Sequence, residues 1–169
     1  MMKRRVLFSL PLLAVPTTDA RAGTNYELFG VILLQPQELF QARLDSAESL
    51  SNYIKAIGIA ADDFAARHDW LPPSTGFIVL AIRPNRQSRV WLDFDQPLPE
   101  ASARDLTSTL SMVPPPAVTG GTVALAIKVG MWGGPASSRS TPAPAEWRAA
   151  AERAGRPLEV TQLIDSIWH

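Results

Sequence analysis

The sequence predicts an α+β fold: a small antiparallel sheet with two main helices on one face and a helical tail at the C-terminus. Two strand-like segments, 76–83 and 90–94, flank a short polar turn and therefore predict a β-hairpin. Segments with apolar residues at helical spacing lie before and after this hairpin. The 169 residues allow one domain, and a hydrophobic content of 46% with 19% charged residues is enough for a packed core.

The first 22 residues have the pattern of a secretory signal peptide. Positive charge from Lys3 to Arg5 precedes an apolar run over 6–15, and the triplet that ends at Ala22 has the small-x-small form of a cleavage site. A run of ten apolar residues is too short to span a bilayer, which needs about 20 residues. We therefore expect cleavage after Ala22 and a periplasmic or secreted protein.

Removal of this segment changes the net charge of the chain. The first 22 residues hold four basic residues and one acidic residue, so residues 23–169 hold 12 Lys and Arg against 15 Asp and Glu, a net charge of −3. A mildly acidic chain has no electrostatic reason to bind nucleic acid or anionic lipid. The absence of cysteine excludes thiol catalysis and Cys-based metal sites, and we expect no cofactor and no metal.

The N-terminal part of the domain reads as a strand followed by a helix. The apolar run 28–34 predicts a buried strand, closed by the Gln35-Pro36 pair. Asp45 and Glu48 have the spacing of a capping box, and Gly58 is expected to break or bend the helix that follows. The sequence Trp70-Leu71-Pro72-Pro73 ends that helix. Its apolar face is predicted to hold Leu50, Tyr53, Ile54, Ile57, Ala61 and Phe64.

The hairpin leads into a second helix and a further strand. Residues 84–88 form the turn, and the prolines at 97 and 99 open a helix that runs to Met112 before the triple proline 114–116. Alternation predicts that Val90, Leu92 and Phe94 share one face of their strand, opposite Trp91 and Asp93. The strand 122–132 is predicted to place Val123, Leu125, Ile127, Val129 and Met131 on a large apolar face and Ala124, Ala126, Lys128, Gly130 and Trp132 on a lighter face.

A linker separates this α+β domain, 23–134, from a C-terminal tail. The linker 135–144 is rich in Pro, Ser and Gly. In the tail, 145–169, a helix is predicted over 146–154 with Gly155 just after its end, whereas 158–168 suits either a strand or a helix. We expect the tail to pack on the domain.

The order of strand, turn, strand, helix, proline stop, Gly-Gly and strand over 76–134 resembles the C-terminal domain of TonB-type energy transducers. The sequence departs from that family's pattern at the turn, where Arg86-Gln87-Ser88 replaces the usual glycine. The resemblance implies a TonB-like fold and a periplasmic or outer-membrane protein as partner. The matching positions are residues 76–82, Pro84-Asn85, Val90, Ala103, Leu106, Pro115, Gly120-Gly121 and 123–129.

Few residues offer catalytic chemistry. Asp93 and Asp95 form a D-x-D pair that could work as acid and base with His68, although both carboxylates are expected to face solvent and His68 to cap a helix end. The tryptophans are more informative, because exposed Trp is frequent in binding hot spots. We therefore select Trp91, Lys128 and Trp132 as candidate partner-binding residues.

The sequence thus favours a non-enzymatic, exported protein-interaction module that binds a partner through its sheet edge or its Trp-bearing face. At the edge, a strand of the partner would add to the sheet through main-chain hydrogen bonds. Two alternatives stay open: a small periplasmic hydrolase using Asp93, Asp95 and His68, and a dedicated inhibitor or chaperone of an exported enzyme. The sequence does not indicate the oligomeric state.

Overall fold

The structure is a computed structural model that describes residues 25–169. The predicted signal peptide and its cleavage site lie outside the described residues. Within residues 25–169, no helix is both long enough and apolar enough to cross a membrane.

Over residues 25–169, four strands form one antiparallel sheet in the order β1-β4-β2-β3. The strands are β1 (Tyr26–Leu33), β2 (Ser74–Arg83), β3 (Gln87–Phe94) and β4 (Val123–Met131). The predicted hairpin is β2–β3, and β4 returns to pair with β2 on the other side. Among the described residues, β1 pairs with β4 alone and β3 with β2 alone, so these two strands are the edges of the sheet.

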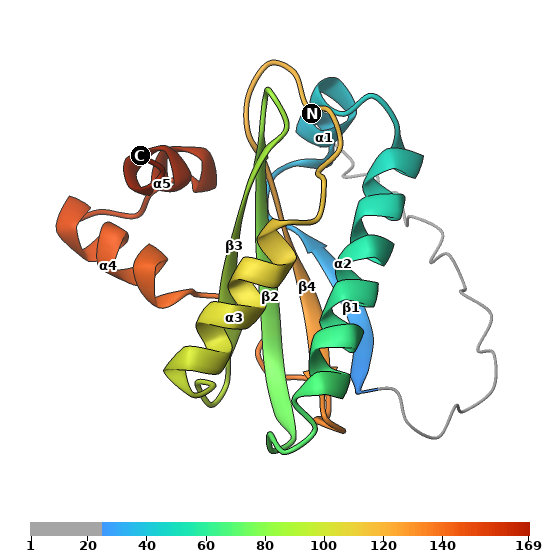
Figure 1. Ribbon diagram of the computed structural model, residues 1–169. Helices are drawn as coiled ribbons and strands as arrows, with labels where there is room; N and C mark the ends of the chain where they lie inside the picture. Colours follow the sequence, from blue (N-terminus) through green and yellow to red (C-terminus); the bar gives the residue numbers. More distant parts are fainter. Residues whose placement is uncertain (1–24) are drawn as a thin grey trace, which may run out of the picture.

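Helices cover both faces of this sheet (Figure 1). The long helix α2 (Ala47–Arg67) and α3 (Glu100–Ser111) lie on one face, as predicted, whereas α4 (Ala145–Ala154) and α5 (Val160–Ile167) pack against the other face. The short helix α1 (Gln37–Arg43) follows β1. The predicted α+β class, with two main helices on one face and a helical tail, is confirmed.

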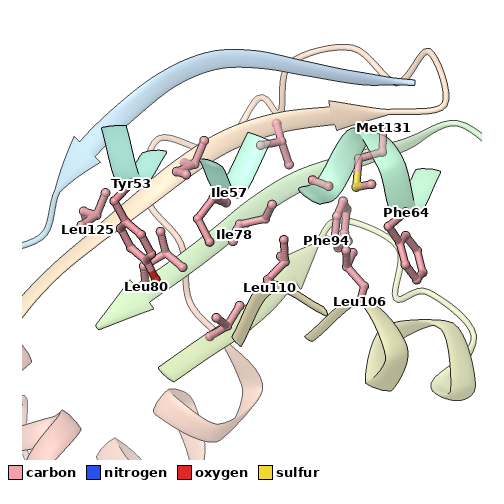
Figure 2. Packing of buried hydrophobic residues seen from close by; sticks show 14 of the residues in the cluster. Tyr53, Ile57, Phe64, Ile78, Leu80, Phe94, Leu106, Leu110, Leu125 and Met131 are labelled. Carbon is pink, nitrogen blue, oxygen red and sulfur yellow. The ribbon is translucent and has the colours of Figure 1, made fainter. Parts of the chain in front are cut away.

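The main core lies between the sheet and helices α2 and α3 (Figure 2). The predicted alternation explains it, because every second residue of β2, β3 and β4 points to this face. From the helices come Tyr53, Ile57 and Phe64 of α2 and Leu106 and Leu110 of α3, all of them buried. The strands contribute Ile78, Leu80, Val90, Phe94, Leu125, Ile127 and Met131.

A second, smaller core lies under α4 and α5. Small side chains from the strands, Ala81, Ala124 and Ala126, let the tail approach the sheet closely, and Ile164 of α5 is fully buried there. Trp147 of α4 packs edge-on against Trp91, with ring centroids 5.4 Å apart. The ambiguous segment 158–168 is therefore helical over Val160–Ile167, because burial of one apolar face of α5 favours the helix.

Two local expectations about α2 were wrong. The N-cap is Ser46, whose hydroxyl accepts a hydrogen bond from the Ser49 N–H at 3.0 Å, rather than Asp45 one residue earlier. Gly58 does not break the helix, which runs without interruption over Ala47–Arg67. Instead, the missing side chain at Gly58 makes room for the ring of Tyr26, which would lie 3.1 Å from a Cβ there.

Tyr26 gives the protein an alkaline sensitivity that can be measured. Burial raises the pKa of Tyr26 to about 12 from its ordinary value of 10.0. The folded state therefore keeps a proton that the unfolded chain releases between pH 10 and 12, so the free energy of unfolding falls as the pH rises through that window. Tyr26→Phe should remove up to about 2.7 kcal/mol of this alkaline loss and leave neutral stability almost unchanged. Urea unfolding of both proteins at pH 8 and pH 12 tests this; parallel losses in the two would contradict it.

Candidate functional site

The outer strand β1 exposes an unusual amount of apolar side chain. Leu28, Phe29, Val31 and Leu33 are 43%, 37%, 41% and 36% exposed. The prediction of a buried strand over 28–34 was therefore wrong, because β1 lies at the sheet edge and α2 covers its face only in part. Contiguous exposed apolar surface usually marks an interaction site.

The main chain of β1 is also open to a partner. Hydrogen bonds at the two ends of the strand, from Trp132 N–H to Asn25 O (2.9 Å) and from Leu34 N–H to Ala124 O (3.0 Å), fix which residues bond to β4. In an antiparallel pair, residues that bond to the neighbouring strand alternate with residues whose N–H and C=O groups point away from it. In the register of β1 with β4, the outward-pointing residues are Tyr26, Leu28, Val31 and Leu33.

A β-bulge divides this edge. The register shifts between Leu28 and Gly30, so that Phe29 is the extra residue. Its ring lies on the other side of the strand, close to Gly130 of β4. The pairing partners of Leu28, Val31 and Leu33 all belong to the main core, so these three side chains share the α2 side of the sheet. Together the three side chains form an apolar strip, which we call the β1 strip.

The β1 strip leads into a cavity of about 390 Å³. This cavity lies between the end of β1, helix α1 and the first turn of α2, which follow one another in the chain. Its polar rim includes Asp45, whose carboxylate accepts hydrogen bonds from Ser46 N–H (2.8 Å) and the Ser49 hydroxyl (2.6 Å). The apolar residues that line it are Leu33, Phe40, Leu44 and Leu50.

Gln35 holds this edge rigid where β1 ends. Its side-chain amide donates to Thr122 O at 3.2 Å and to the Thr161 hydroxyl at 2.8 Å, and its carbonyl accepts from Ala124 N–H at 3.0 Å. The buried side chain thus ties β1 to β4 and to α5. A fixed edge strand loses little conformational freedom when a partner binds.

The opposite edge of the sheet, β3, is bordered by helices α3 and α4 and is less open than β1. Two cavities of about 570 and 730 Å³ follow β3 between α3 and α4. Paired charges surround them: Arg89 binds both carboxylate oxygens of Glu146 (2.9 and 3.1 Å), which also accepts from the Trp91 indole at 2.6 Å. These contacts attach α4 to β3, so side chains of this edge strand already bind the C-terminal tail.

Asp93 and Asp95 do lie together, and Asp95 is exposed as expected, whereas Asp93 is buried. The Asp93 side chain is only 9% exposed. Arg139 from the linker forms ion pairs with Asp93 (2.8 Å) and Asp95 (2.7 Å), and the Ala143 N–H donates to Asp93 at 2.6 Å. Burial alone would lower the pKa of Arg139, but the hydrogen bonds and charges of the two aspartates outweigh it and raise that pKa. The pair therefore fastens the linker to the sheet.

Removal of Arg139 should be costly, because it leaves the buried Asp93 without its counter-charge. Arg139→Met is expected to lower the free energy of unfolding by about 3 kcal/mol. The matched control is Arg104→Met, which removes an exposed pair with Glu100 and should cost less than about 0.5 kcal/mol. Urea denaturation measures both; equal costs would show that the Arg139 cluster is not a buried ion pair in solution.

The hydrolase constellation is not assembled. His68 is the C-cap residue of α2, as expected, and its ring Nδ1 lies 2.9 Å from Phe64 O while the ring stacks on Phe64 at 3.9 Å. Phe64 belongs to the α2 and α3 core, whereas Asp93 points to the opposite face of the sheet, as the alternation of β3 predicts. His68 and the two aspartates therefore lie on different faces.

The three candidate partner-binding residues do not share a surface. Trp91 is buried under α4, and Lys128 donates to Ser137 O at 3.1 Å in the linker. Trp132 was expected on the lighter face of its strand, but its φ of 53° turns the side chain into the main core, where the indole donates to Ala65 O at 3.0 Å. Sequence reasoning missed the β1 strip, and its only signal was an apolar run with a single charged neighbour, Glu27.

Comparison with known proteins leaves the function to be argued from these residues. No protein-family model, no curated protein and no solved structure matches the chain.

Proposed function

We propose that this protein is a non-enzymatic, exported interaction module that binds an extended segment of a partner protein by adding it as a fifth strand to β1. The observation that carries the proposal is the β1 strip: three exposed apolar side chains on the same residues whose main-chain groups point outward. Main-chain hydrogen bonds would supply affinity, and side-chain contacts on alternate residues would supply specificity.

Other features of β1 support this proposal. Natural edge strands are commonly protected against pairing by Lys, Pro or an inward-pointing charge. β1 has no Lys or Pro, and its one charged residue, Glu27, lies near its start; its one protective feature is the bulge at Phe29, after which Val31 and Leu33 continue the open edge. The TonB-like order of elements over 76–134 agrees with a sheet-edge binder, and the expected partner is another periplasmic or outer-membrane protein.

Charged substitutions in the strip test the proposal. A displayed library of random peptides is selected against the protein, and the affinity of the enriched peptides is measured by fluorescence anisotropy. Val31→Asp combined with Leu33→Asp should weaken their binding at least about tenfold, because a bound strand would bury both carboxylates.

The control for this pair is Met112→Asp, at an apolar residue that is 81% exposed at the end of α3. It should leave binding unchanged. Equal binding by the parent protein and the doubly charged variant would refute β1 as the site.

A further inference from the structure

The net negative charge of the domain is concentrated around the β1 strip. Residues 25–68, which form β1, α1 and α2, contain six Asp and Glu and three Lys and Arg, whereas residues 69–169 contain nine of each. The net charge of −3 therefore belongs to the elements that border the strip. Among the basic residues of 25–68, Arg43 already donates a hydrogen bond from its guanidinium to Thr122 O, just before β4.

Acidic side chains lie at both ends of the strip. Glu27 is exposed near the start of β1, where its pairing with Gly130 places its side chain on the face opposite to the strip. Past the other end, Asp45 lies on the rim of the apolar cavity, and Glu38 is exposed in the first turn of α1. The hydrogen bond from the Ser49 hydroxyl lowers the pKa of Asp45, so its carboxylate stays charged. A ligand that complements this surface would have an apolar centre and basic ends.

We infer that the occupant of the β1 edge is a cationic amphipathic strand: an extended segment with large apolar residues at alternate positions and Lys or Arg at each end. This inference rests on the proposed strand addition. Residues of the added strand that lie opposite Leu28, Val31 and Leu33 share their side of the sheet, since directly opposed residues project to the same face. The apolar residue next to Leu33 reaches the cavity, and the basic ends meet Glu27 and Asp45.

The same charges argue against a second copy of this chain as the occupant. Two β1 strands paired antiparallel would bring Glu27 of one copy toward the acidic end of the other, where Asp45 and Glu38 lie. The bulge at Phe29 also interrupts the outward-pointing residues that such a pair would need to match.

Three synthetic nine-residue peptides test the inference. The first and second have alternating Leu and Thr in the centre, whereas the third has its Leu residues grouped together. The first has two Lys at each end, the second has two Glu at each end, and the third has Lys ends. Fluorescence anisotropy in 20 mM salt should show that the Lys-ended alternating peptide binds at least about tenfold more tightly than either of the others. Raising the salt to 500 mM should reduce its advantage over the Glu-ended peptide, because salt screens exposed charges.

A matched pair of variants locates the charges. Glu27→Gln, Glu38→Gln and Asp45→Asn together should cut the preference for Lys ends to about twofold or less. The control combines Asp105→Asn, Glu152→Gln and Glu159→Gln, three exposed positions outside the β1 region, and should keep the preference.

The outcomes separate this inference from the proposed function. Equal binding of Lys-ended and Glu-ended alternating peptides at low salt would overturn the charge inference and leave strand addition standing. Failure of both alternating peptides to bind would overturn strand addition at β1 as well. A preference that survives the triple change at Glu27, Glu38 and Asp45 would overturn the assignment of the basic ends to this edge.

Discussion

Val31→Pro is expected to lower the affinity for a bound strand at least about 100-fold while the protein stays folded. The N–H of Val31 points away from β4, so a proline there removes no hydrogen bond of the sheet. It does remove the central donor for an incoming strand, and its ring occupies the space that strand needs. Gly30 precedes it and tolerates proline as a neighbour, because it has no Cβ and nothing lies within 4 Å of its side-chain position.

The matched control is Ser88→Pro, which makes the same change at the other edge of the sheet. The Asp95 N–H donates to Thr75 O at 2.8 Å, so the odd-numbered residues of β3 bond to β2. Ser88, which pairs with Ile82, is therefore a position whose N–H points outward. It should not affect binding. If Ser88→Pro abolished binding and Val31→Pro did not, the partner would occupy the β3 groove and the β1 assignment would be wrong.

Gly130→Ala is expected to destabilise the protein by about 3 kcal/mol or more, a large effect for the addition of a single methyl group. The chain turns back after β4, so that a Cβ at position 130 would collide with the main chain of Gly134 and with the ring of Phe29, 2.8 Å away. The backbone cannot yield easily, because the turn is closed by a hydrogen bond from Gly134 N–H to Met131 O at 3.0 Å.

Gly30→Ala provides the comparison, because Gly30 is paired with a nearby position of β4 and has open space around it. Its stability should stay the same or rise by about 0.5 kcal/mol through a less flexible unfolded chain. Urea unfolding of both variants decides the matter, and a Gly130→Ala protein as stable as Gly30→Ala would show that the turn after β4 is not packed as described.

The sequence predicted the parts of the fold that depend on local pattern. Alternation in β3 and β4 placed Val90 and Leu125 in the main core, and Gly155 ends α4 in the left-handed conformation, with a φ of 63°. Such patterns follow from side-chain periodicity and backbone freedom within a few residues, which a single sequence contains. Helix α1 was missed because seven residues after Pro36 give too few turns for a periodic signal.

The candidate site could not be predicted because its features depend on distant pairings. An apolar run has the same composition at the centre of a sheet and at its edge, so the exposure of Val31 depends on the pairing of β1 with β4 alone. Asp93 looked solvent-exposed because its partner, Arg139, lies 46 residues further along the chain. Trp132 was misplaced because a positive φ just after β4 breaks the alternation.

Amide hydrogen exchange with and without the Lys-ended alternating peptide tests strand addition most directly. We predict that the outward amides of β1, at Leu28, Val31 and Leu33, become protected at least about tenfold in the complex, while those of β3 at Ser88 and Leu92 exchange as before. Protection confined to the β3 amides, or saturating binding with no change at β1, would contradict the central claim that β1 accepts a partner strand.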